Sequence, residues 1–392
     1  GIGSLSNTIF EAYRLADTLK GPKTTVVMGG PHASFMPEEA LDHCDYVVIG
    51  EGEDAFPALI QRLETNTPVS GVEGLAFREN NETVYCRKSS PKVDFKSLPS
   101  PDFEMSPQLG KKEDVPPILV ISRGCPHDCS FCSVTAMFGR KYRFKDIEQV
   151  ISELQPVLHR SVCFGDDNFS ANPVHTKNLL REMIARKSVP LRWSGQMCVK
   201  AASDDEMLDL MAQTNCRTAY IGIESVNSET LKKYGKQHHV DEVAKCVEKL
   251  HDHRIGIHGM FVVDTDDAPD TASRIVDYAI ETDMETIQIF SLTPFPGTKS
   301  FEDNKERILH RHWNFYDGMH VVVEPRHASA HDMQRAIIDQ MKRFYSLKRG
   351  LTAYRPHRAW RVKYRLGGHV LLKRWEKENK DYLDRLKSGD WH

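Results

Sequence analysis

The chain has 392 residues, of which 40% are hydrophobic, and its formal net charge is −3 at pH 7. This length predicts two or three domains with sizeable cores, and the near-neutral charge excludes a surface built as a whole for nucleic acid. We see no signal peptide and no apolar run near the ~20 residues of a membrane span. Nine cysteines in such a chain indicate a reducing compartment, so we expect a cytoplasmic protein.

The first 69 residues alternate amphipathic and apolar segments as a parallel α/β domain does. The pattern predicts helices over 8–20, 37–41 and 54–63, and strands over 24–28 and 46–49. Two strands do not make a parallel sheet that is covered on both faces, so we expect further strands upstream of residue 1 and a truncated doubly wound domain. Ligands bind such sheets beyond the carboxyl ends of the strands. Glycines and acids follow both strands there, namely Gly29, Gly30, Glu51, Gly52 and Glu53, with His32 close by; taken singly, these are ordinary turn glycines.

The sequence pattern of residues 70–116 predicts a β-hairpin with its turn near Asn80 and Asn81. A proline-rich connector follows it. We expect this segment to link two domains.

Residues 117–300 repeat strand and helix with connections long enough to require parallel pairing. The pattern predicts a partial (β/α)₆ barrel, whose functional groups lie at the carboxyl ends of the strands. The predicted strands cover 118–122, 162–165, 192–197, 219–223, 257–263 and 286–292, and the predicted helices cover 146–159, 173–187, 204–213, 240–253 and 270–282.

Three cysteines follow the first of these strands on one short loop. Cys125, Cys129 and Cys132 are separated by three and then two residues, so a loop that curls once can aim all three sulfurs at one centre. A [4Fe–4S] cube normally takes four thiolates, and no fourth cysteine is near, which leaves one iron open to a non-protein ligand. The alternative is a zinc knuckle with His127 as fourth ligand, although zinc sites usually come as two separated pairs.

This cysteine loop resembles the signature of the radical SAM superfamily, which has an aromatic residue before the last cysteine, here Phe131. The resemblance implies that the open iron binds S-adenosylmethionine and that an electron, from a donor such as flavodoxin or ferredoxin, cleaves it to a 5′-deoxyadenosyl radical. Asp166 and Asp167 would accept hydrogen bonds from the cofactor's ammonium group, and Glu224 from that group or from a ribose hydroxyl. The cofactor-binding residues expected at strand ends are Gly165, Asp166, Asp167, Ser194, Gln196 and Glu224.

The glycine turns of the first domain resemble those of the cobalamin-binding domain fused to many radical SAM enzymes. The resemblance implies that Gly29, Gly30, Glu51, Gly52 and Glu53 border the corrin. Many cobalamin proteins donate a histidine from an Asp-x-His-x-x-Gly loop, and this pattern is absent here. We therefore expect His32 to line the pocket or lie at the surface, and we expect weak cobalamin binding without the strands expected upstream.

Residues 301–392 predict a helical extension, with an amphipathic helix over 330–347. The segment 355–375 mixes basic and aromatic residues, which suits either peripheral contact with a membrane or a helix packed on the barrel, and we favour packing. Between Asp264 and Asp270, four aspartates in seven residues suit a cation site or a helix cap, and we favour the cap.

The expected activity is cobalamin-dependent methylation of an unactivated carbon in a small-molecule or lipid-like substrate. Ring closure or carbon–carbon coupling by the same cofactors is the first alternative, and a corrinoid carrier or sensor without turnover is the second. A methylthiotransferase would need a second cluster domain and a nucleic-acid module; neither is visible, so we expect no nucleic-acid partner.

Overall fold

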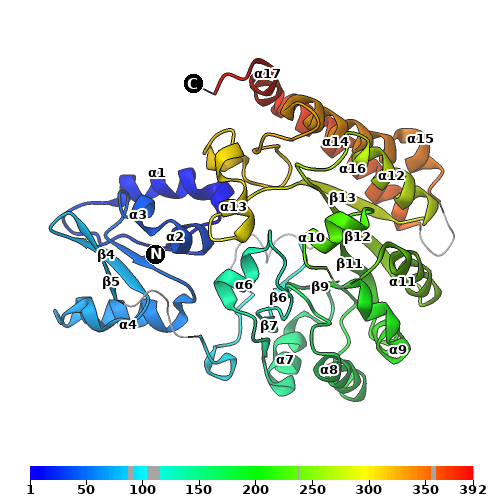
Figure 1. The fold of residues 1–392 in the computed structure, drawn as a ribbon. Helices are drawn as coiled ribbons and strands as arrows, with labels where there is room; N and C mark the ends of the chain where they lie inside the picture. The colour runs from blue at the N-terminus through cyan, green and yellow to red at the C-terminus, as the bar shows by residue number, and fades with distance from the viewer. Residues whose placement is uncertain (87–91, 104–114, 237, 355–358, 392) are drawn as a thin grey trace. The chain divides into compact units, whose positions relative to one another are not determined.

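The computed structural model describes residues 1–86, 92–103, 115–236, 238–354 and 359–391 (Figure 1). Parts of the proline-rich connector, 87–91 and 104–114, therefore lie outside the described residues. The chain forms two compact units. The first, here called the N-terminal unit, comprises Gly1–Pro99, Gly124–Lys141 and Thr293–Asp317; the second, here called the barrel unit, comprises Ser100–Arg123, Tyr142–Leu292 and Gly318–His392.

The N-terminal unit contains a five-stranded sheet in the order β1-β2-β3-β4-β5. The first three strands are parallel, and β4 and β5 form an antiparallel hairpin that joins the sheet along β3. Both predicted strands and the three predicted helices are present. The elements are β1 (Ile2–Gly3), α1 (Ile9–Leu19), β2 (Val27–Gly29), α2 (Pro31–Phe35), α3 (Pro37–Ala40), β3 (Tyr46–Val48), α4 (Gly52–Glu64), β4 (Leu75–Glu79) and β5 (Glu82–Cys86).

The predicted hairpin is part of this sheet and not of the connector. Its turn residues Asn80 and Asn81 have φ values of 51° and 66°, as a type I′ turn requires. An isolated hairpin is only marginally stable, whereas here Leu75 and Ala76 are fully buried between β3 and the unit's core. The two-residue strand β1, which the sequence analysis missed, gives the sheet a third parallel strand.

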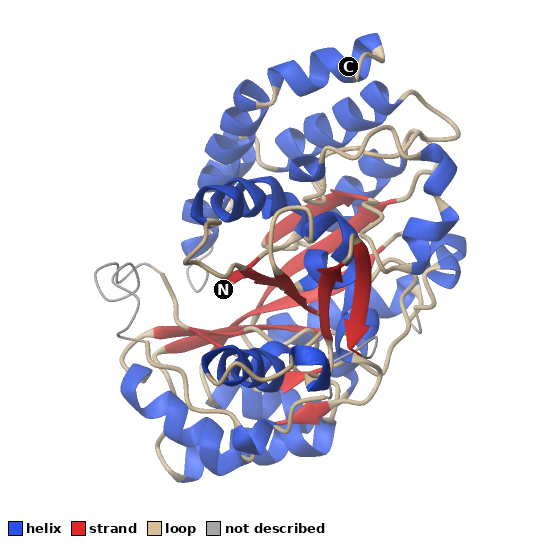
Figure 2. Cartoon of the chain, turned by 90° about the vertical axis from the view of Figure 1, so that its left-hand side faces the viewer, coloured by secondary structure: helices blue, strands red, loops and turns tan. Residues whose placement is uncertain are grey.

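The barrel unit confirms the predicted partial barrel. Its six parallel strands have the order β13-β12-β11-β10-β9-β6, and helices cover the outer face (Figures 1 and 2). The elements are β6 (Ile118–Leu119), α7 (Ile147–Leu154), β9 (Ser161–Phe164), α8 (Pro173–Ala185), β10 (Arg192–Met197), α9 (Asp205–Gln213), β11 (Cys216–Glu224), α10 (Ser228–Lys233), α11 (Val240–Asp252), β12 (Gly256–Val263), α12 (Thr271–Glu281) and β13 (Thr286–Ser291).

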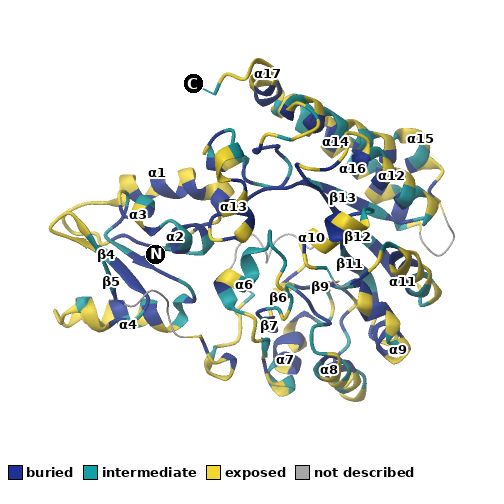
Figure 3. Ribbon diagram, in the orientation of Figure 1, coloured by how far each residue is buried: buried dark blue, intermediate teal, exposed yellow. Residues whose placement is uncertain are grey.

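The barrel strands are largely buried (Figure 3), and burial alternates from residue to residue along β10 and β13. In β10, Trp193 and Met197 are buried against the helices, whereas Arg192 and Gln196 are exposed on the inner face. The first strand is shorter than predicted, because the chain after Leu119 bends away and β7 (Ser122–Arg123) pairs with β8 (Arg143–Phe144).

Within the described residues of the barrel unit, the helices after the last strand are α14 (Ala330–Phe344), α15 (Leu347–Leu351), α16 (Trp360–Glu378) and α17 (Lys380–Ser388). The basic helix α16 packs on the barrel, as favoured above, and its buried arginines face inward. Arg361 donates to both carboxylate oxygens of Asp283 at 2.7 and 2.9 Å, and Arg365 donates to the carbonyls of Met284 and Glu285. No helix in the described part of the chain is both long and apolar enough to cross a membrane.

Candidate functional site

The three cysteines of the predicted cluster loop lie between β7 and α6 (Ser133–Phe138), in the N-terminal unit. All three are half-buried and none forms a disulfide; the ring of Phe131 beside them is also half-buried. The loop turns at Gly124, where φ is +87° and a Cβ would come within 2.5 Å of the Lys141 carbonyl oxygen, so only glycine fits. Three cysteines outside disulfides on one loop are a donor set that an iron–sulfur cube accepts.

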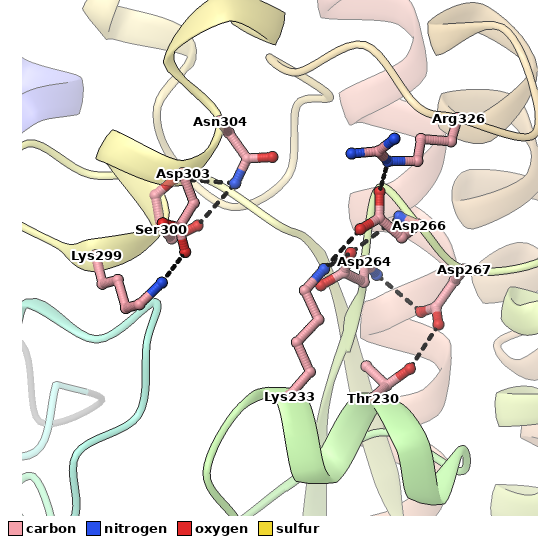
Figure 4. Close-up of polar contacts among 10 residues, drawn as sticks. All are labelled: Thr230, Lys233, Asp264, Asp266, Asp267, Lys299, Ser300, Asp303, Asn304 and Arg326. Carbon is pink, nitrogen blue, oxygen red and sulfur yellow. Dashed lines mark hydrogen bonds and ion pairs between the residues drawn. The ribbon is translucent and has the colours of Figure 1, made fainter.

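The loop is held by the segment around α13 (Lys299–Asp303). Ser300 donates its backbone N–H to the Ser130 carbonyl at 2.9 Å, and Asn304 in turn donates its side-chain N–H to the Ser300 carbonyl at 2.9 Å (Figure 4). Among the described residues, no three His, Cys, Asp or Glu side chains gather closely enough to hold a single metal ion. A cube places its thiolates on different irons, so it requires a different arrangement from that of one ion.

In the barrel unit, Asp166 follows β9 and is almost completely buried. Its Oδ1 accepts a hydrogen bond from the Ser122 hydroxyl, and its Oδ2 is buried without a partner among the described residues. Burial raises the pKa of Asp166 to about 7. An N–H donor from a bound cofactor would satisfy the orphaned oxygen, so this residue fits the ammonium role expected for it. Asp167 is half-buried, and burial raises its pKa despite the nearby Arg123.

The remaining residues expected to bind the cofactor lie at different levels of the barrel strands. Gly165 is required by packing, because a Cβ there would lie 2.6 Å from the Ile118 side chain. Ser194 and Gln196 lie on the inner face of β10, and Gln196 pairs in register with Tyr220. Glu224 is four residues further along β11, about 13 Å at the usual strand rise, so it lies well beyond the level of Gln196.

Glu224 has a partner that the sequence analysis missed. The Nζ of Lys236 lies 2.7 Å from Glu224 Oε1, and both side chains are largely buried. The Glu224 backbone has φ of +67°, an uncommon conformation for a residue with a side chain. Lys236 comes twelve residues later, beyond α10, in a segment without a recognisable motif, so only the fold reveals the pair.

The acidic loop after β12 does not cap the next helix as predicted. Asp270, at the N-cap of α12, makes no side-chain capping bond. Instead, Lys233 of α10 binds Asp264 at 2.8 Å and Asp266 at 2.9 Å, and Asp267 accepts from the Thr230 hydroxyl at 2.8 Å (Figure 4). Arg326 also binds Asp266, at 2.8 Å. The aspartates therefore tie three segments of the barrel unit together.

At the turns of the N-terminal sheet, the glycines divide into two kinds. Gly30 is required locally, because its φ is +89° and a Cβ would lie 2.7 Å from the Ser4 carbonyl. Gly29 and Gly52 are not, since a Cβ at either would meet nothing nearer than 3.6 and 3.5 Å. Neither internal packing nor the backbone conformation demands glycine there, which fits a backbone that a large ligand approaches. Glu51 is buried near Lys92, at 3.8 Å, and Glu53 is half-buried.

His32 is buried, which corrects the expectation that it lines a pocket or the surface. Its side chain is fully enclosed, with Nδ1 3.0 Å from the Ser6 hydroxyl and Nε2 3.4 Å from Glu39 Oε1. The same Glu39 oxygen accepts from the indole N–H of Trp313 at 2.9 Å. Both ring nitrogens therefore have partners within the protein.

Residues 119–279 match the family model of the radical SAM superfamily, and residues 1–60 match that of the B12 binding domain. The chain therefore contains a radical SAM domain and a B12-binding domain. The predicted resemblance to cobalamin-binding radical SAM enzymes and the predicted enzyme class are thereby confirmed at the family level. The cofactors that these domains bind are confirmed as well: a [4Fe–4S] cluster, S-adenosylmethionine and cobalamin.

Two curated relatives of this radical SAM protein are methylating enzymes by name. Bacteriochlorophyllide d C-12(1)-methyltransferase of Chlorobaculum tepidum is 29% identical over 85% of this chain and 72% of its own length. Hopanoid C-3 methylase of Methylococcus capsulatus is 26% identical over 92% of this chain and 70% of its own length.

Among solved structures, the cobalamin-dependent S-adenosylmethionine radical enzyme OxsB with aqua-cobalamin bound has a TM-score of 0.72 at 17% identity. The match covers 95% of this chain and 63% of that longer chain. At this identity the likeness shows the fold alone.

Proposed function

We propose that the protein methylates an unactivated carbon of a small organic substrate. The observation that carries the proposal is the loop with three cysteines, none of them in a disulfide, in a chain that also has a B12-binding domain. When bound, the cluster with S-adenosylmethionine supplies a radical that abstracts hydrogen, and cobalamin supplies a methyl group. The relatives named methyltransferase and methylase support methylation. A non-catalytic corrinoid carrier would have no use for the cysteine loop.

The chain's own residues hold and orient these groups. Cys125, Cys129 and Cys132 bind the cube as thiolates. Asp166 accepts a hydrogen bond from the cofactor's amino group through Oδ2, the buried oxygen that has no partner among the described residues. Glu224 would accept a hydrogen bond from a ribose hydroxyl, and Lys236, 2.7 Å away, holds the carboxylate in position.

The N-terminal sheet would hold cobalamin through the backbone at Gly29 and Gly52, with Glu51 and Glu53 nearby. His32 would stay in its internal network, since both of its ring nitrogens already have protein partners. A reduced flavodoxin or ferredoxin supplies the electron that S-adenosylmethionine cleavage requires.

The test is replacement of Cys125, Cys129 and Cys132 together by alanine, followed by anaerobic reconstitution. We expect the variant to lose its iron and sulfide and to form no 5′-deoxyadenosine, because its thiolates are the cluster's protein ligands. The matched control replaces Cys163 and Cys198, which are also half-buried and outside disulfides but do not belong to the loop. A triple variant that keeps a full cluster and cleaves S-adenosylmethionine would show the assignment to be wrong.

A further inference from the structure

The barrel unit contains a cavity of about 480 Å³ at the amino ends of its strands. This volume lies in the range of small-molecule sites, roughly 300–1,000 Å³. Its walls include the first residues of several strands, among them Ser161 in β9, Arg192 in β10 and Thr286 in β13. The candidate cofactor residues Asp166 and Glu224 lie instead at the carboxyl ends, whereas Ser194, also expected to bind the cofactor, lines this cavity.

Helix α16 closes the cavity with an aromatic face. Trp360, Tyr364, Leu371 and Trp375 line it, and their spacing of four, seven and four residues places them on one side of the helix. The helix is fixed in position by the buried contacts of Arg361 and Arg365 described above. The cavity therefore has a rigid wall that suits the flat or apolar body of a ligand.

The strands contribute neutral polar groups to the opposite wall. Tyr220, His258 and Gln288 line the cavity, and His258 Nδ1 is 2.8 Å from the Thr286 hydroxyl. Burial lowers the pKa of His258 to about 4, so its ring is neutral at pH 7. A void left by imperfect packing is lined by apolar groups, whereas apolar walls with a few polar groups are typical of a ligand site.

The charges of the lining are all positive. It includes Arg192 and Arg217 and no aspartate or glutamate. Arg217 lies over the Trp360 ring at 4.7 Å. Arg192 is exposed, and in the described part of the chain its guanidinium makes no ion pair. A free arginine beside an aromatic wall recognises an anionic group on an apolar ligand.

We propose that this cavity binds an amphipathic organic anion. Its ring or chain body lies against the aromatic face of α16, and its carboxylate or other anionic group binds Arg192. This inference rests on the proposed function, because we take the ligand to be the substrate of the methylation. The cavity holds the end of the substrate that does not react. Glu224 lies four residues beyond Tyr220 on the same strand, about 13 Å away, so an elongated substrate spans the distance to the cofactor edge.

The test uses anilinonaphthalene sulfonate, an aromatic anion whose fluorescence rises in apolar sites and which accepts excitation energy from Trp360 and Trp375. We expect saturable binding to the wild-type protein. Leu371→Glu, which puts a negative charge on the aromatic wall, and Arg192→Gln should each weaken binding by about tenfold or more.

The controls change neighbouring or similar residues that do not line the cavity. Val370 and Leu371 are equally exposed on α16, at 63% and 65%, so Val370→Glu matches Leu371→Glu in charge and in effect on folding. Arg274→Gln, at an exposed arginine of α12, matches Arg192→Gln. Binding that is absent in the wild type, or equal in all four variants, would overturn the proposal.

A failure of this inference can be told apart from a failure of the proposed function. The triple cysteine variant should bind the probe as the wild type does, because the cavity lies in the barrel unit and needs no cluster. S-adenosylmethionine cleavage without probe binding would overturn the cavity assignment alone. Probe binding with the expected variant effects, in a protein that never cleaves S-adenosylmethionine, would overturn the proposed function alone.

Discussion

Asp166 shows how one buried carboxyl group links the candidate site to stability. Burial raises its pKa from 3.8 to about 7, so the folded protein keeps this proton over a pH interval in which the unfolded chain has released it. Because the folded state then binds more protons, the stability contributed by this group falls as pH rises through that interval and is lowest above about pH 7.

We therefore predict that Asp166→Asn makes the cofactor-free protein less sensitive to pH. Three pKa units correspond to at most about 4 kcal/mol, so the variant should gain up to that amount over the wild type between about pH 4 and pH 7. Unfolding midpoints in denaturant across this range measure the difference. Asp252→Asn, at an exposed aspartate, is the control and should follow the wild type. Parallel profiles for Asp166→Asn and the wild type would contradict the prediction.

Candidate site residues could be predicted from the sequence where reactive or polar side chains directly follow a predicted strand. The spacing of the cysteines and the G-D-D turn could be read directly, because each comes immediately after a strand. Residue partners could not be read in this way. The pairing of Lys236 with Glu224, and the enclosure of His32 by Ser6 and Glu39, join residues that are distant in sequence.

At the scale of elements, Lys233 ties α10 to the acidic loop. Its ammonium group binds Asp264, whose side chain is fully buried, and Asp266. We predict that Lys233→Met lowers the free energy of unfolding by about 1–2 kcal/mol, because it leaves the Asp264 charge without its partner. The expected loss of stability is small for a buried carboxylate because Lys233 is 47% exposed, so solvent already screens the ion pair.

The matched control for Lys233→Met is Lys232→Met, one residue earlier on the exposed side of the same helix. Denaturant unfolding of both variants gives the comparison. Equal stabilities would mean that the acidic loop does not depend on this ion pair.

Elements with strong periodicity were predicted within a few residues. Strand β10 has the predicted bounds, and α11 and α12 differ only at their ends, because long apolar repeats determine both type and position. The exceptions depend on distant partners. The two-residue strand β1 is too short to leave a pattern, the hairpin's place in the sheet depends on β3, and the aspartates before α12 bind α10 instead of capping their own helix.

At the scale of the whole molecule, the proposed methylation requires two different uses of S-adenosylmethionine by a chain with a B12-binding domain and a radical SAM domain. Reductive cleavage at the cluster yields 5′-deoxyadenosine and methionine, whereas donation of the methyl group yields S-adenosylhomocysteine. Ring closure or coupling would need only the first. The two products therefore separate methylation from the alternatives without knowledge of the substrate.

The most direct test of this account is anaerobic incubation of the reconstituted protein, with cobalamin and a reductant, in S-adenosylmethionine labelled at the methyl group. We predict that both 5′-deoxyadenosine and S-adenosylhomocysteine form, and that label appears outside S-adenosylmethionine and methionine, on cobalamin. We also predict that the triple cysteine variant forms no 5′-deoxyadenosine. If the wild type forms 5′-deoxyadenosine while the label stays entirely in S-adenosylmethionine and methionine, the protein is not a methyltransferase.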